Sequence, residues 1–133
     1  MKRFFIFLVC GLMMSALSVS EIQAQPCPTS PIKVDNFNDL KNELVLAKAS
    51  GCPVDIHLTP LTPPVGTNTV DVTSPIEIPV NVILWIDAGA ELAANGVKDY
   101  IDNQGIIIVN GSLSYSGNAF KHAGNVVVVP PGS

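Results

Sequence analysis

Three short apolar runs recur at similar intervals along the second half of the chain. They are Asn81–Leu92, Ile106–Leu113 and Asn125–Val129, and the glycines after the first two strands, Gly89 and Gly111, lie 22 positions apart. Short strands repeated at a period of roughly 20 to 50 residues are typical of solenoids, in which each turn buries its apolar face against the next turn. The sequence therefore predicts a mainly β fold, a short parallel β-helix.

A parallel β-helix fixes both the direction and the register of its strands. If successive turns stack in parallel, we expect Ile83, Ile107 and Val127 to lie in register with one another. The alternative is a small antiparallel sandwich, because alternating short strands do not by themselves fix strand direction.

The N-terminus has the layout of a secretory signal peptide. Lys2 and Arg3 precede an apolar run over residues 4–14, and small residues follow up to Ala24. We expect residues 1–24 to be removed and the protein to be secreted, periplasmic or at the cell surface. The apolar run is too short to cross a bilayer, and no other stretch approaches the roughly 20 apolar residues that a membrane span needs.

The charge of the remaining chain disfavours polyanionic partners. Without Lys2, Arg3 and Glu21, the seven basic and eleven acidic residues become five lysines and ten acids, and no arginine remains. Such a surface repels phosphate backbones and lacks the guanidinium group that grips them. We expect no nucleic-acid partner.

Cys27 and Cys52 are the cysteines that follow the signal peptide. An even count in an exported chain predicts a disulfide. Closing a loop of that size stabilises a fold by roughly 3 to 4 kcal/mol in the chain-entropy model.

The pattern of residues divides the exported chain into a leader and one domain. Residues 25–34 are rich in Pro, Ser and Thr and should form an extended leader, and residues 35–133 should form the β-helix domain. That domain begins with an amphipathic helix over residues 35–51, capped by Asp35 or Asn36 and stopped at Gly51. We expect this helix to cover the open end of the β-helix core.

The strand around residues 82–86 differs from a half-exposed strand, because both of its faces carry bulk. Val82, Leu84 and Ile86 alternate with Ile83 and Trp85. Such a strand is either fully interior or has an outer face that meets another surface.

The stretch Asn81-Val-Ile-Leu-Trp-Ile-Asp-Ala-Gly-Ala-Glu-Leu-Ala-Ala94, followed by Lys98-Asp99-Tyr100, resembles the early turns of right-handed β-helix enzymes that degrade polysaccharides, especially the polygalacturonase-like glycoside hydrolases. The preceding helix is similar to the caps of pectate-lyase-like proteins. The resemblance covers about residues 53–115 and implies a right-handed coil. The shared pattern consists mainly of residues that form strands and turns and that pack between successive turns.

The resemblance supplies no active site. The catalytic motifs of those hydrolases, Asn-Thr-Asp, Asp-Asp, Gly-His-Gly and Arg-x-Lys, do not occur in this chain. One reading is therefore a non-catalytic module. The alternative is an N-terminal fragment of a polygalacturonase-like hydrolase whose active-site turns are missing.

Other candidate chemistry is weak in the sequence. Asp99 and Asp102 are the closest acidic pair of interest, but their surroundings are typical of a solvated loop between turns. His57 and His122 are far apart in sequence and are interpreted as structural or surface residues. We predict no catalytic residue, no metal site and no cofactor.

Four residues are candidates for binding a ligand. If Trp85 and Tyr115 point outward from neighbouring turns, they form a flat platform for a sugar ring, with Asp87 and Asn110 as hydrogen-bonding partners. The competing interpretation, which we favour, places Trp85 in the core.

These observations favour an exported, non-catalytic β-helix module that is carbohydrate-associated or serves as a structural, adhesive element at the cell surface. Polysaccharide is the candidate partner. The apolar strand Val126–Val129 would leave an unpaired edge, which makes self-association through an open C-terminal end a further expectation.

Overall fold

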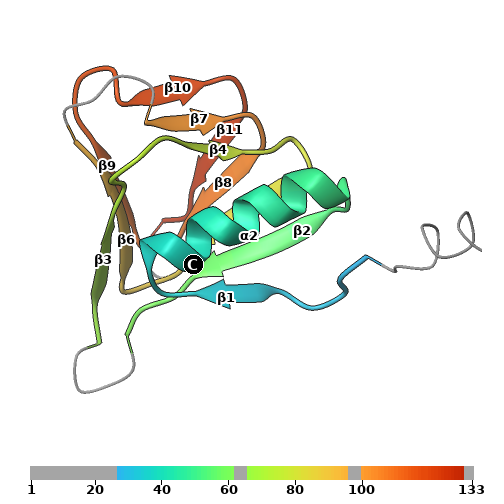
Figure 1. Cartoon of the computed structure of the whole chain (residues 1–133). Helices are drawn as coiled ribbons and strands as arrows, with labels where there is room; N and C mark the ends of the chain where they lie inside the picture. The colour runs from blue at the N-terminus through green and yellow to red at the C-terminus, as the bar shows by residue number, and fades with distance from the viewer. Residues whose placement is uncertain (1–26, 62–65, 96–99, 131–133) are drawn as a thin grey trace, which may run out of the picture.

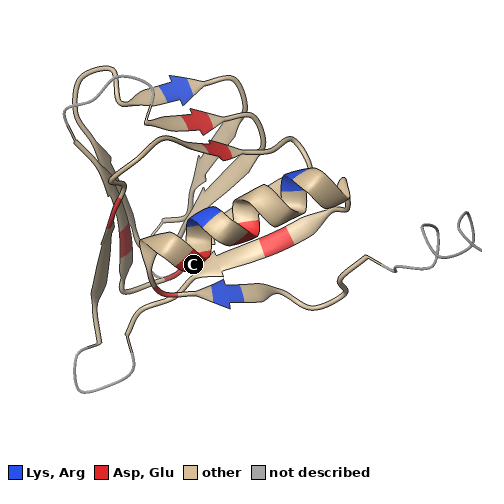
Figure 2. Cartoon of the chain, in the orientation of Figure 1, with Lys and Arg blue, Asp and Glu red and all other residues tan. Residues whose placement is uncertain are grey.

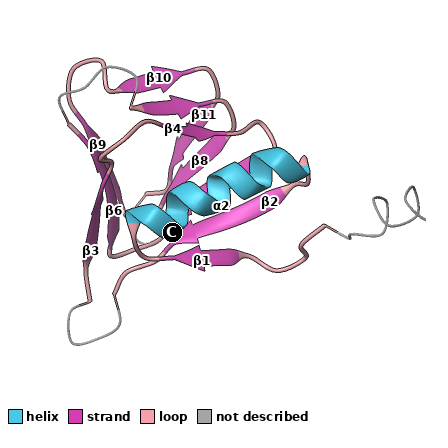
Figure 3. Ribbon diagram, viewed as in Figure 1, coloured by secondary structure: helices cyan, strands magenta, loops and turns pink. Residues whose placement is uncertain are grey.

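The computed structural model describes residues 27–61, 66–95 and 100–130, so the expected signal peptide lies outside the described residues. The fold is mainly β, with one helix (Figures 1 and 3). Its elements are β1 (Ile32–Val34), α2 (Phe37–Ser50), β2 (Val54–Leu58), β3 (Asn68–Asp71), β4 (Ile76–Ile78), β5 (Val82–Ile86), β6 (Ala90–Ala94), β7 (Ile101–Asn103), β8 (Ile106–Val109), β9 (Ser112–Tyr115), β10 (Phe120–His122) and β11 (Asn125–Val128).

The strands form three parallel sheets. Sheet A has the order β1-β2-β5-β8-β11, sheet B has β3-β6-β9, and sheet C has β4-β7-β10. From β2 onward, successive strands belong to sheets A, B and C in rotation, and Figure 1 shows the three sheets around a common centre. Parallel sheets are confirmed, and the antiparallel sandwich is excluded for the described strands, because each of their pairings is parallel. The right-handed coil stays a prediction.

The core is a column of aliphatic side chains from corresponding positions of successive strands. In sheet A, Leu84 pairs with Ile107, and Ile107 pairs with Val126. Leu84 and Ile107 are fully buried. Strand alternation turns every second residue inward. β2 and β5 each contribute three buried aliphatic side chains to this column.

The expected register of Ile83, Ile107 and Val127 is wrong by one residue. Ile83 pairs with Ile106, and Val127 pairs with Ile108, so both point to the outer face of sheet A. The expected intervals were 24 and 20 residues, and each is one residue longer than the observed interval, 23 (Trp85 to Ile108) and 19 (Ile108 to Val127). A strand whose two faces both carry apolar residues does not show in its sequence which face is inward.

The expected capping helix is present as α2. The Asn36 side chain accepts a hydrogen bond from the Asp39 backbone N–H at 2.9 Å, and Gly51 ends the helix in the left-handed conformation at φ 68°. Leu40, Leu44 and Ala47 are buried. The helix contacts β2, β4 and β5, and thus covers the first strands of the column (Figure 1).

The segment around Asp102 is a strand, so its interpretation as a solvated loop is wrong. Ile101 and Asn103 of β7 are fully buried, and β7 pairs with both β4 and β10. β7 has only three residues, and two of them, Asp102 and Asn103, are polar. It therefore lacks the alternation of apolar and polar residues by which a strand is recognised in a sequence. Asp99 lies outside the described residues.

The N-terminal leader is tied to the domain in two ways. Its last residues form β1, which pairs with β2 through Lys33 opposite His57. The predicted disulfide between Cys27 and Cys52 is confirmed, with a Cα–Cα distance of 5.5 Å. In the described part of the chain, no helix has the length and apolar character needed to traverse a bilayer.

Candidate functional site

The outer surface of sheet A has an unusual distribution of apolar and polar side chains. On this surface, β5, β8 and β11 present large apolar residues at positions that alternate with the core. We name this surface face A. Its apolar centre consists of Ile83, Trp85, Ile106, Ile108 and Val127, and its polar rim consists of Lys33, Asp55, His57, Asp87, Asn110 and Asn125.

The apolar centre arises from strand alternation combined with register. Ile83 is paired with Ile106, and Trp85 is paired with Ile108, which in turn is paired with Val127. The first four are half-buried because they shield one another, while Val127 at the edge strand is 49% exposed. β5 is therefore not a fully interior strand, because Ile83 and Trp85 are only half-buried. That its outer face meets another surface stays a prediction.

Trp85 is not in the core, and the interpretation that we favoured in the sequence is wrong on this point. The indole lies on the outer surface, between His57 of β2 and Ile108 of β8. The rings of His57 and Trp85 stack, with centroids 5.3 Å apart and planes inclined by 9°. One flat face of the indole is therefore taken by the imidazole.

His57 links two of the predicted ligand-binding residues. Its Nδ1 lies 2.9 Å from Oδ1 of Asp87, while its ring stacks on Trp85. Asp87 thereby holds the imidazole in place against the indole, and the three side chains form one unit. The side chains of His57 and Asp87 are 24% and 30% exposed, so solvent reaches both.

Asn110 belongs to the same face, and Tyr115 does not. Asn110 is exposed directly after β8, and its backbone N–H donates to the Ile86 carbonyl at 2.8 Å, which places it beside Asp87. Tyr115 is paired with Ala94, a core position of sheet B, and stacks on Phe120 at 5.0 Å. The structure therefore brings Trp85, Asp87 and Asn110 together and leaves Tyr115 at the end of the column.

The sequence did not identify His57 as part of a site. The sequence did indicate that His57 points away from the core, because it lies between the apolar residues Ile56 and Leu58. Trp85 lies in the same way between Leu84 and Ile86. To place His57 beside Trp85, one must know that β2 and β5 are parallel neighbours and that paired residues are 28 positions apart in the sequence. That information is tertiary and does not appear in the local pattern.

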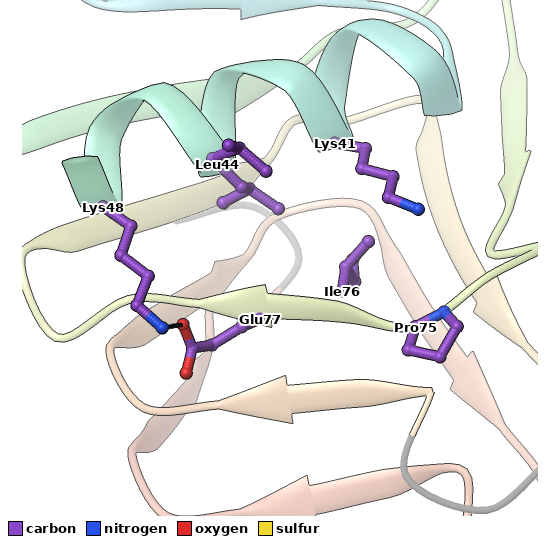
Figure 4. A pocket seen from close by; sticks show the side chains of 7 residues that line it. Lys41, Leu44, Lys48, Pro75, Ile76 and Glu77 are labelled. Atoms are coloured by element: carbon purple, nitrogen blue, oxygen red, sulfur yellow. Dashed lines mark ion pairs between the residues drawn. The ribbon is translucent and has the colours of Figure 1, made fainter.

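A hollow lies where α2 meets β4, away from face A, and Figure 4 shows its lining. Leu44 and Ile76 form its floor. The two lysines on its helix side are already engaged, because Lys41 donates to the Ser74 hydroxyl at 2.7 Å and Lys48 forms an ion pair with Glu77. This hollow is the seam between the capping helix and sheet C, and its polar groups serve that contact.

Metal chemistry has no support within the described residues, where no group of three or more His, Cys, Asp or Glu side chains is placed to hold an ion. Asp102 and His122 are engaged by other side chains: Asp102 accepts from the Gln104 side chain at 2.8 Å, and the His122 ring lies against the rings of Phe120 and Tyr115. No family model, curated protein or solved structure matches this chain.

Proposed function

We propose that the protein is an exported, non-catalytic, right-handed parallel β-helix module that acts as a structural, adhesive element at the cell surface through face A. The observation that carries this proposal is the composition of that face: an apolar centre on a parallel sheet, surrounded by a polar rim. Interaction surfaces between proteins commonly have this anatomy. Large exposed apolar patches on soluble domains are often interaction sites.

The β-helix part of the proposal rests on topology and resemblance. Strands that visit three parallel sheets in rotation, with each strand paired to the third one after it, are what a three-sided solenoid requires. The resemblance of residues 81–100 to polygalacturonase-like enzymes supports the same architecture and the right-handed sense. The disulfide is compatible with an oxidising compartment outside the cytoplasm.

The aliphatic nature of face A favours a flat partner surface over a sugar ring. Ile83, Ile106 and Ile108 are β-branched side chains without flat faces, and His57 covers one face of Trp85. A sugar stacks best on an uncovered aromatic face. A flat protein or wall surface can instead bury all the apolar side chains of face A at once.

The adhesion proposal is tested by adding the purified protein to cells of the producing organism and measuring the fraction retained. Ile106→Lys places a charge in the centre of face A, and we expect it to lower retention by about tenfold, since a buried unpaired charge is costly at an interface. Ser112→Lys adds the same charge to the outer face of sheet B and serves as the control. Equal retention of the two variants would contradict the proposal.

Carbohydrate association is the second candidate function. The observation that favours it is the cluster of Trp85, Asp87 and Asn110, which joins an indole to polar groups able to bind hydroxyls. Electrophoresis through gels containing neutral polysaccharides provides the test. Retardation that is lost in Asp87→Ala and kept in Ser112→Ala would support this function, and free migration in every gel would remove it.

The hydrolase alternative stays a prediction and is settled separately. It requires further turns that carry the catalytic motifs absent from this sequence. Reading the coding DNA beyond Ser133 is sufficient, since a continuing frame with Asn-Thr-Asp and Gly-His-Gly would establish the enzyme.

A further inference from the structure

We propose that the end of the molecule formed by β9, β10 and β11 packs against the same end of a second copy of this chain, related by a two-fold axis. Each of these strands is the edge strand at one end of its sheet, and the three edges lie at the same end of the molecule. The outer edge of each strand presents backbone N–H and C=O groups that have no strand partner among the described residues. Such edges pair readily with another chain.

The apolar column stops abruptly at this end. In sheet A, Val128 is 70% exposed, although its partner Val109 in β8 is 5% exposed. In sheet B, Tyr115 is 45% exposed over a fully buried Ala94. The same register positions are thus buried in one turn and exposed in the next, which is what a missing neighbour produces.

The opposite end of the column is not available for the same contact. There α2 lies across β2 and β4 and buries Leu40, Leu44 and Ala47 (Figure 1). Stacking of the β11 end of one copy on the first turn of another would have to displace this helix. Contact between two β11 ends leaves both helices in place, and it closes at a dimer because the interface is isologous.

The distribution of charge also favours contact between two copies at this end. The whole chain has a formal charge of −4, yet no acidic residue lies between Asn103 and Ser133. Figure 2 shows acidic residues on the earlier strands of all three sheets and only Lys121 coloured in the last turn. Lys121 points away from the column because Phe120 beside it is buried. Two copies therefore approach through this end without repulsion between carboxylates.

Strand direction suits a two-fold contact. If the two-fold axis is perpendicular both to the column and to β11, β11 of one copy runs antiparallel to β11 of the other, and antiparallel pairs are at least as stable as parallel ones. The four residues of β11, Asn125–Val128, contain no proline and no charge that would blunt the edge. This inference concerns the end of the column and does not depend on what face A binds.

Sedimentation of the whole expressed chain over a wide range of concentrations tests the dimer. We expect a monomer–dimer equilibrium, and Val128→Lys should raise its dissociation constant by about tenfold or more, because a charge is then buried without a partner. Val127→Lys is the matched control: it adds the same charge one residue away, on face A, and should leave the constant within about twofold. Both positions are exposed, so neither variant should prevent folding.

Amide hydrogen exchange gives a second readout that needs no variant. Exchange in β9, β10 and β11 should slow as concentration rises, while exchange in β3 stays unchanged. A monomer at every concentration would overturn the proposal. So would a dimer that Val127→Lys weakens as much as Val128→Lys, or growth into assemblies larger than the dimer.

Discussion

Gly111 occupies a corner of the chain that has no space for a side chain. A Cβ atom built on Gly111 would lie 2.1 Å from the Ala90 carbonyl oxygen and 2.3 Å from the Asp87 carbonyl oxygen. Gly89 and Gly111 each stand directly before a strand of sheet B. Only Gly89 has a positive φ, at 88°, so Gly111 is required for a different reason, the close approach of one turn to the turn before it.

Gly111→Ala should therefore destabilise the fold by about 3 kcal/mol or more, because the overlapping atoms belong to backbone and cannot rotate away. Gly117→Ala is the control. Gly117 has a φ of 58° and open space around its Cβ position, so only the left-handed strain of about 1 to 2 kcal/mol applies. Urea unfolding followed by circular dichroism measures both. A smaller loss for Gly111→Ala than for Gly117→Ala would refute the stacking of these corners.

At the scale of elements, α2 and β2 were predictable because their signals are local. Capping by Asn36, the stop at Gly51 and the alternation in β2 are all read within a few residues. The short strands β7, β9 and β10 were not recognised, since three or four residues carry too little periodicity. Their formation depends on neighbours that pair with them on one or both sides.

The packing of α2 on the column is tested by a matched pair of leucines. Leu44 is 2% exposed and contacts the core, whereas Leu46, two positions on, is 61% exposed. Leu44→Ala should cost about 2 to 5 kcal/mol of unfolding free energy, and Leu46→Ala should cost less than about 0.5 kcal/mol. The two values follow from thermal or urea denaturation under the same conditions. Equal costs would mean that the helix does not cap the column.

At the scale of the whole molecule, the sequence indicated parallel strands but could not fix their register or the composition of a surface. Face A combines residues of β5, β8 and β11 with His57 of β2 on its rim. Each expected interval was one residue too long, and a one-residue shift exchanges the inner and outer faces of a strand. Thus Ile83 and Val127, which were expected in register with Ile107, lie on face A and not in its row. Trp85, Asp87 and Asn110 were predicted from the sequence, whereas His57 and the isoleucines of β8 could be added to the site only once the sheets were known.

The disulfide is a constraint on the whole domain, since it ties the N-terminal leader to the residue after the α2 stop. Its two cysteines are 25 positions apart. Replacing both, in Cys27→Ser with Cys52→Ser, should lower the free energy of unfolding by roughly 3 kcal/mol, mainly because the unfolded chain gains freedom. Urea unfolding with and without reductant checks this. Reductant should destabilise the original protein and leave the double variant unchanged, and an equal response of the two would contradict a bridging role.

Successive strands of sheet A lie in parallel, with Leu84, Ile107 and Val126 forming one row of the column. Nuclear Overhauser effects between backbone protons of β5, β8 and β11 measure this most directly, because strand direction determines which protons approach one another. Parallel pairing predicts contacts between α and amide protons in the register Leu84–Ile107–Val126, without strong contacts between α protons of different strands. Strong α-to-α contacts between these strands would show antiparallel pairing and would contradict it.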